Sequence, residues 1–390
     1  TTVTDFIEFS DRLKNLPPYL FVEIDKAKKA AIAEGRDVVN LGIGDPDLQT
    51  PSHIIEAMKK AVEDGENNHY AIDSGLPELN QEIATWFQNR FNVSLDPETE
   101  IYPVIGSKEG IAHLPLGVIN PKDKVLLTDP AYPAYRPTIE FAGGKIVNIP
   151  LKAGSNFLPD LKKIADIKDP KMIVINYPNN PTAATATKEF YEGLVALAQE
   201  KNFIILSDMA YSEIYYDGEK PLSILEIEGA KDVAIEFHSL SKTYYMTGWR
   251  IGWACGNPKL IAALAKVKSN IDSGIFQAVQ VAGIAALKSD PEIIDDMRTL
   301  FQDRRDYLIN GLRGLGWKIT PPKAAFYVWA KLPKGFSNSM ETAKAFLDQA
   351  NIVATPGNGF GPAGEGYIRM ALTVSTDRIN EAVTRLQKIL

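Results

Sequence analysis

Short apolar runs alternate with longer amphipathic stretches along most of the chain. The runs at 124–129, 172–178, 203–208 and 233–239 are rich in Val, Ile and Leu, and each contains three or four consecutive apolar residues. Such runs are typical of strands that helices cover on both faces of a parallel sheet. The stretches between them repeat their apolar residues at helical spacing. The pattern predicts an α/β domain with a mainly parallel sheet over residues 50–285.

Two helix starts carry capping residues. Thr50-Pro51 places a Thr cap before a Pro at the first helical position, and Thr187 precedes a stretch with one apolar face. The chain ends in a further amphipathic pattern, which predicts a terminal helix. Its predicted inward residues are Ile379, Ala382, Val383, Leu386 and Ile389.

The segment after residue 285 has a different order of elements. It opens with a helical pattern and continues with two strand-like runs, AAFYVWAKL at 324–332 and GYIRMAL at 366–372. Strands grouped with helices in this way predict a smaller α+β domain over 286–390. We expect the N-terminal segment 1–49 to join this smaller domain.

Composition and charge narrow the class of protein. A length of 390 residues fits two or three domains, and a net charge of −7 disfavours broad binding to nucleic acid. No apolar run approaches the roughly 18 residues that span a bilayer, and the first residues do not resemble a secretory signal. The single cysteine, Cys255, fits a reducing compartment, and the four histidines lack metal-ligand spacing. We therefore expect a cytoplasmic protein without a membrane segment or a metal site.

Residues 359–364 spell GFGPAG, a literal match to the dinucleotide-binding fingerprint. That fingerprint works only between a strand and a helix, because the helix N-terminus holds the pyrophosphate. Here the next residues, GYIRMAL, have the composition of a strand. The match therefore favours a tight loop over a nucleotide site.

The segment 236–256, EFHSLSKTYYMTGWRIGWACG, carries the clearest chemical signal. Lys242 lies in it among small and aromatic residues, close to Ser239 and eight residues before Arg250. An isolated lysine is usually a solvated surface charge. Burial would lower its pKa and expose a nucleophilic amine, which forms Schiff bases with aldehydes. The neighbouring hydroxyls and guanidinium would suit a phosphate.

The pattern S-x-S-K-T-Y-x-M-T-G-W-R-x-G resembles the pyridoxal-phosphate lysine motif of the class I and II aminotransferases. Six further segments resemble the family in the same order along the chain. They are GIGDPD (42–47), GSKEG (106–110), DPAYPAY (129–135), YPNNPT (177–182), SDMAY (207–211) and GEGYIRMAL (364–372). The resemblance implies an aspartate-aminotransferase-like fold (fold type I), pyridoxal 5'-phosphate as cofactor and a homodimer with shared active sites.

The resemblance assigns the cofactor contacts. Lys242 would hold the cofactor and move the proton during the reaction. Asp208, at the end of an apolar strand, would pair with the pyridinium nitrogen, which must stay protonated to draw electrons. On sequence grounds alone, Asp208 could also be a helix cap. The other implied contacts are Asn180 and Tyr211 at the phenolic oxygen, Tyr132 against the ring, and Ser107, Lys108, Ser239 and Arg250 at the phosphate. Tyr70 would reach the phosphate of the partner subunit.

Substrate contacts follow from the same resemblance. Arg369 is a lone charge in an apolar run, and a buried charge is costly unless it is paired. The resemblance implies that it clamps the substrate α-carboxylate, and a structural ion pair is the alternative. Gly44 would offer its amide to the same carboxylate. Lys108 and Asp73 would meet a distal carboxylate and a distal ammonium, with solvent exposure as the alternative for both.

Two positions depart from the family pattern. Ala183 follows NNPT where the family usually has Gly, and Ala tolerates a positive φ poorly. Tyr245 stands in the lysine motif where many relatives have Asn. Neither change removes a group that the reaction needs, so we expect both to affect only the shape of the pocket.

Within the family, RLKNLPPYLFVEID, GIGDPDL, GSKEGIAHLPL and FHSLSKTY are most similar to the LL-diaminopimelate aminotransferase branch. This similarity implies amino transfer from LL-diaminopimelate to 2-oxoglutarate in lysine biosynthesis. Aspartate, alanine and broad-specificity branches share much of the pattern, and other pyridoxal enzymes such as β-lyases keep the same cofactor residues. A non-catalytic ligand sensor with this fold is a further alternative, against which an intact Lys242 argues.

Overall fold

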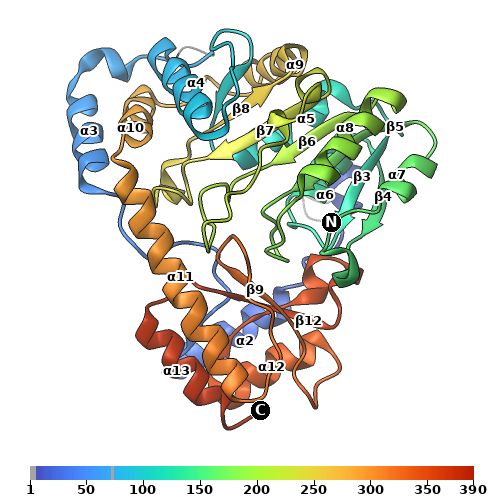
Figure 1. The fold of residues 1–390 in the computed structure, drawn as a ribbon, viewed down its shortest axis with the longest axis vertical. Helices are drawn as coiled ribbons and strands as arrows, with labels where there is room; N and C mark the ends of the chain where they lie inside the picture. The colour runs from blue at the N-terminus through green and yellow to red at the C-terminus, as the bar shows by residue number, and fades with distance from the viewer. Residues whose placement is uncertain (1–5, 72–73) are drawn as a thin grey trace.

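A seven-stranded sheet forms the centre of the larger part of the molecule (Figure 1). The computed structural model describes residues 6–71 and 74–390. The strand order is β2-β8-β7-β6-β5-β3-β4, with β8 antiparallel to both neighbours and the last five strands parallel. The strands are β2 (Ile101–Val104), β3 (Lys124–Asp129), β4 (Lys145–Pro150), β5 (Pro170–Asn176), β6 (Ile204–Asp208), β7 (Ala234–Ser239) and β8 (Gly252–Gly256). The predicted mainly parallel sheet is confirmed.

The four apolar runs of the sequence are the central strands β3, β5, β6 and β7. Successive residues of a strand point to opposite faces, so both faces are apolar. In β3, Val125 and Leu127 pack into one core cluster, whereas Leu126 packs into another. This arrangement explains why the runs lack polar alternation.

Helices cover both faces of the large sheet. One face packs against α5 (Ser107–Val118), α6 (Tyr135–Phe141) and α9 (Pro258–Ser269). The other face packs against α4 (Pro77–Phe91), α8 (Lys188–Lys201) and α10 (Gln277–Leu287). Helices α3 (Ser52–Glu63) and α7 (Leu161–Asp166) extend this second layer.

A second core lies at the other end of the molecule (Figure 1). An antiparallel sheet of order β11-β12-β9 consists of β9 (Tyr327–Lys331), β11 (Thr355–Pro356) and β12 (Tyr367–Ala371). Strand β1 (Val39–Asn40) pairs with β10 (Ile352–Val353), so the N-terminal segment packs with the C-terminal one. Helices α2 (Val22–Ala33), α11 (Pro291–Gly314), α12 (Ser339–Ala350) and α13 (Thr376–Leu386) pack around these strands. The domain limits at 49/50 and 285/286 stay predictions.

Local predictions have mixed outcomes. Thr187 caps α8 by accepting a hydrogen bond from Phe190 N, as predicted. The predicted cap at Thr50 is wrong: Pro51 is the N-cap of α3, and the Thr50 hydroxyl donates to the Tyr245 carbonyl instead. Ile389 lies beyond the end of α13 but still packs against the core of the smaller part, so its predicted inward position is confirmed.

The GFGPAG segment forms two short 3-10 helices, Gly357–Phe360 and Pro362–Gly364, and the next element is strand β12. A strand in that position agrees with the interpretation as a tight loop. Over residues 6–71 and 74–390, none of the helices is both long enough and apolar enough to cross a membrane.

Candidate functional site

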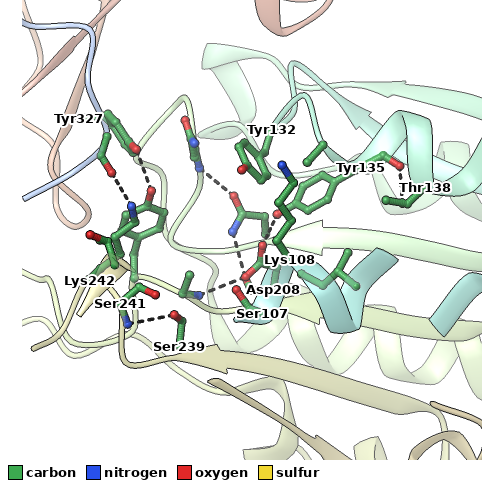
Figure 2. Close-up of a pocket in the computed structure, with 18 of the residues that line it drawn as sticks. Ser107, Lys108, Tyr132, Tyr135, Thr138, Asp208, Ser239, Ser241, Lys242 and Tyr327 are labelled. Atoms are coloured by element: carbon green, nitrogen blue, oxygen red, sulfur yellow. Dashed lines mark hydrogen bonds between the residues drawn. The ribbon is translucent and has the colours of Figure 1, made fainter. Parts of the chain in front are cut away.

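A cavity of about 350 Å³ lies between the large sheet and the smaller sheet. From the large sheet, the ends of β5, β6 and β7, the loop after β7 and the start of α5 contribute side chains to its lining. Strands β9 and β12 and the loop around Gly44 contribute further lining residues. The sequence-predicted residues that line it are Gly44, Ser107, Lys108, Tyr132, Asn180, Asp208, Tyr211, Ser239, Lys242, Arg250 and Arg369. Figure 2 shows Lys242, Asp208 and Tyr132 around this space.

Parallel strand ends place the polar groups at the bottom of the cavity. Asn176 ends β5, Asp208 ends β6 and Ser239 ends β7. Asn176 and Asp208 are register partners on neighbouring strands, and the Asn176 side chain donates to the Asp208 carbonyl over 3.0 Å. Ligands of open α/β sheets bind at these carboxyl ends.

Asp208 is a buried carboxylate held by two donors. Its Oδ2 accepts a 2.5 Å hydrogen bond from the Tyr135 hydroxyl, and its Oδ1 accepts one from Ala210 N (Figure 2). Burial raises the pKa of Asp208 to about 6, although the two hydrogen bonds oppose this shift. A cationic partner in the cavity would therefore be favoured beside this side chain.

The Lys242 side chain is partly buried, and its pKa is lowered as the sequence predicts. Burial lowers its pKa to about 8; the carboxylate of Asp45 opposes this shift, and the guanidinium groups of Arg250 and Arg369 add to it. Its Nζ donates a hydrogen bond to the Gly44 carbonyl. A lysine with this pKa is neutral often enough near neutral pH to act as a nucleophile and a base.

This lowered pKa predicts how the cofactor-free protein reacts with an aldehyde. Only the neutral amine attacks, and the neutral fraction of Lys242 grows as the pH rises through about 8. The rate of pyridoxal phosphate capture, followed by stopped-flow absorbance, should rise with pH and level off above that midpoint. A rate that still climbs steadily above about pH 9.5, towards the ordinary lysine pKa of roughly 10.4, would contradict the assignment.

A cradle for an anion lies at the start of α5. Gly106 is the N-cap with a φ of 78°, and Ser107 and Lys108 open the helix, so backbone N–H groups point into the cavity. A Cβ at position 106 would collide with the Arg250 guanidinium, which lies directly over this turn. Arg250 itself donates to Thr247 O over 2.6 Å.

Ser239 completes the cradle from the end of β7, where its hydroxyl accepts from Ser241 N. A helix N-terminus, a guanidinium and hydroxyl groups around one space suit a phosphate.

Arg369 is a buried cation with unused hydrogen-bonding capacity. It donates to Asn180 Oδ1 over 2.7 Å and to Gly42 O over 3.0 Å, and it lies over the Tyr327 ring. Its Nε is buried without a partner, and no acidic side chain in the described part of the chain forms an ion pair with it. The alternative of a structural ion pair is therefore not observed, and a carboxylate ligand would satisfy this group.

Comparison with known proteins identifies the family. The family model described as aminotransferase class I and II matches residues 36–386. The chain belongs to this family. It is 54% identical to an LL-diaminopimelate aminotransferase from Aquifex aeolicus, over 98% of this chain and 99% of that protein. It is 53% identical to a protein of the same name from Nitratidesulfovibrio vulgaris, over 99% of this chain and 100% of that protein.

Solved structures agree on the aminotransferase fold. Substrate-bound BacF from Bacillus subtilis matches with a TM-score of 0.93 and 36% identity, over 98% of both chains. A mutant of Thermus thermophilus aspartate aminotransferase matches with a TM-score of 0.93 and 30% identity, over 98% of this chain and 100% of that chain. The predicted aspartate-aminotransferase-like fold is thus confirmed.

Members of this aminotransferase family use pyridoxal phosphate. The residues of the cavity fit that group: a partly buried amine for the aldehyde, a buried carboxylate for the ring nitrogen and a cradle for the phosphate. Burial also raises the pKa of Tyr211, whose hydroxyl shares a 2.7 Å hydrogen bond with the Tyr327 hydroxyl. A protonated phenol at that place can donate to an oxygen of the ligand.

The lining residues of the aminotransferase site that sequence reasoning does not identify include Tyr135, Asn176 and Tyr327. Tyr135 lies in the quoted DPAYPAY segment, but only its neighbour Tyr132 was assigned a role. Asn176 ends a predicted strand, and its Oδ1 accepts from Asn180 N. Tyr327 lies in the predicted strand AAFYVWAKL, where alternation alone does not show which residue faces a cavity.

Tyr70, one of the predicted residues, is not among the described residues that line this cavity. Tyr70 is 89% exposed, and the Gln277 side chain donates to its carbonyl. Asp73 lies outside the described residues. The roles of both in a partner subunit stay predictions.

The two departures from the family pattern adopt the same conformation. Ala183 has a φ of 59° and Tyr245 a φ of 54°, both in the left-handed region. Ala183 thus keeps the turn that Gly would allow, at a strain of about 1–2 kcal/mol. Its methyl group is buried in the core of the smaller sheet, and Ala183 N donates to Asn179 O, which holds the turn that presents Asn180.

Proposed function

We propose that the chain is a pyridoxal-phosphate-dependent aminotransferase that takes the amino group of LL-diaminopimelate and passes it to 2-oxoglutarate. The observation that carries the proposal is that one cavity holds a partly buried amine, a buried carboxylate and a buried guanidinium whose Nε has no partner. In this proposal Lys242, Asp208 and Arg369 perform three separate tasks on one small amino acid.

The cofactor, when bound, draws electrons from the substrate Cα and makes its proton removable. Arg369 would hold the α-carboxylate with its planar fork, and the Gly44 amide would donate to the same carboxylate. Lys242 Nζ would take the proton from Cα, because its lowered pKa makes it a base near neutral pH. Asp208 would keep a proton on the ring nitrogen, since a buried carboxylate stabilises an adjacent cation.

The donor is proposed from the relatives and from the space beyond Arg369. Both curated relatives described above carry the name LL-diaminopimelate aminotransferase. A second cavity of about 530 Å³ shares Lys108, Tyr132 and Arg369 with the first. Its walls also carry Asp25 and Lys28, so charges of both signs are present for the distal ammonium and carboxylate of a long donor. We keep Lys108 as the proposed partner of the distal carboxylate, and Asp73 of a second subunit as that of the ammonium.

A donor panel tests this proposal. LL-diaminopimelate should have a higher kcat/KM than aspartate or alanine, because a pocket built for a second charged end leaves its polar groups unpaired with shorter donors. Replacing Lys108 with alanine should lower kcat/KM for LL-diaminopimelate roughly ten-fold more than for alanine, since only the longer donor has a distal carboxylate. The ratio of kcat/KM for the two donors cancels any effect of the substitution on binding of the cofactor phosphate, because both donors use the same cofactor.

Three outcomes would go against parts of the proposal. A higher kcat/KM with aspartate or alanine would favour a different branch of the family. Equal losses for both donors in Lys108→Ala would remove Lys108 from the distal end. Absence of turnover with every donor would favour the alternative of a ligand sensor.

We infer a cytoplasmic homodimer with shared active sites. The support is the exposed aromatic side chain of Tyr70, next to a segment that also exposes Ile271 and Phe276. Exposed apolar groups gathered in this way mark an interaction surface. The proposed partners besides the second subunit are small amino acids and 2-oxoacids, which are the substrates of the proposed reaction in lysine biosynthesis.

A further inference from the structure

A buried lysine outside the cavity holds two acidic side chains. Lys268, in the last turn of α9, has a side chain that is only 1% exposed. Its Nζ lies 2.6 Å from Glu109 Oε1 and within 2.8 Å of both carboxylate oxygens of Asp272. A buried ammonium is tolerated only with such partners, so these contacts fix the position of the lysine.

Glu109 connects this lysine to the anion cradle. It lies in the first turn of α5, two residues after Ser107, and its Oε1 also accepts a 2.8 Å hydrogen bond from Ile105 N. The same carboxylate therefore binds the backbone just before Gly106 and the ammonium of Lys268. The start of α5 is thereby tied to the end of α9.

Asp272 extends the connection into the loop after α9. Its Oδ1 accepts from Gly274 N over 2.7 Å, and Asp272 N donates to Lys268 O. His113, one turn after Glu109, contacts the other oxygen of Glu109 through Nδ1 over 2.8 Å. Glu109, His113 and Asp272 are close enough to ligate a metal ion, but the ammonium of Lys268 already binds both carboxylates, so they carry no metal proposal.

We propose that Lys268, acting through Glu109, is a positioning residue for the phosphate of the cofactor. The proposal rests on the proposed function, because it needs the α5 cradle to bind that phosphate. Lys268 does not line the cavity itself. Through Glu109, Lys268 holds the Ile105–Ser107 turn, where the backbone N–H groups of the cradle begin. Its ammonium also neutralises two carboxylates that lie beside an anion site.

Removing the Lys268 ammonium should weaken binding of the cofactor phosphate and leave the other cofactor contacts in place. In Lys268→Met, Glu109 and Asp272 would face each other without a cation, and like charges in a buried place repel. Glu109 would move or take up a proton, and the turn at Gly106 would lose its support. Lys242, Asp208 and Tyr132, which contact the aldehyde and the ring in the proposed function, lie on other elements and should keep their positions.

The test compares two ligands that differ only in the phosphate. The affinities of the cofactor-free protein for pyridoxal phosphate and for pyridoxal are measured by absorbance titration. In Lys268→Met the Kd of pyridoxal phosphate should rise by about ten-fold or more, whereas that of pyridoxal should change less than about three-fold. Lys268→Arg should restore most of the preference. Lys266→Met, an exposed lysine on the same helix, is the matched control and should behave as the wild type.

Each outcome separates this inference from the proposed function. If the wild-type protein does not prefer pyridoxal phosphate over pyridoxal, the proposed function itself fails. If the wild type has this preference and Lys268→Met keeps it, only the positioning role is overturned. If Lys268→Met does not fold, Glu109→Leu replaces it, because leucine removes both the hydrogen bond from Ile105 N and the contact with Lys268 Nζ. An unchanged phosphate preference in that variant would also overturn the role.

Discussion

Replacing Lys242 with alanine should lower kcat by on the order of 10⁴-fold or more. The variant loses both the amine that binds the aldehyde and the base that moves the substrate proton. No other described lysine that lines the cavity can replace it: Lys108 is exposed at the phosphate end, whereas Lys242 is the partly buried amine beside Gly44. Steady-state kinetics with LL-diaminopimelate and 2-oxoglutarate measure the loss.

The cradle should keep this variant able to bind the cofactor without a covalent link. A matched control is Lys266→Ala, which removes an exposed amine and should leave kcat unchanged. A kcat within about ten-fold of the wild type in Lys242→Ala would contradict the assignment of this lysine as the proton carrier.

Replacing Asp208 with asparagine should lower kcat by about 10²-fold or more while cofactor binding persists. Asparagine keeps the shape and can still accept a hydrogen bond from the Tyr135 hydroxyl, but it lacks the charge that keeps the ring nitrogen protonated. The phosphate cradle does not depend on this side chain. Kinetics and a cofactor titration on the same preparation separate the two effects.

The same variant has a predicted effect on stability without the cofactor. Burial raises the pKa of Asp208 from 3.8 to about 6, so the folded protein binds this proton more tightly than the unfolded chain. The stability that this group contributes is complete below about pH 3.8 and is lost as the pH rises through about 6. Asp208→Asn should remove this loss, whereas the exposed control Asp166→Asn should not. Near-normal turnover in Asp208→Asn would contradict its role.

The positions at strand ends could be predicted from the sequence. Asp208 and Ser239 follow apolar runs, and the carboxyl ends of neighbouring parallel strands meet at one edge of a sheet. Lys242 and Arg250 lie in the loop that follows the same edge. The strand pattern alone places Asp208 and Ser239 at this edge, whereas the resemblance to the family was needed to assign the roles of all four residues.

Residues that depend on packing between the two sheets could not be predicted in this way. Tyr327 reaches Tyr211 from a strand far along the chain, and nothing local in AAFYVWAKL shows which aromatic ring faces the cavity. The network of Lys268 was missed for the same reason, because Glu109 and Lys268 are separated by 159 residues in sequence. The turn at Ala183 shows a different limit: local preference disfavours its positive φ, and the surrounding hydrogen bonds impose it.

Mapping the lysine that binds the cofactor covalently is the most direct test of the proposed function. The purified protein, loaded with pyridoxal phosphate, is reduced with borohydride, digested and analysed by mass spectrometry. We expect the reduced cofactor on Lys242, because this partly buried amine has its pKa lowered to about 8 and lies in the cavity with Asp208 and Arg369. A label on Lys108 or another lysine, or no label at all, would contradict it.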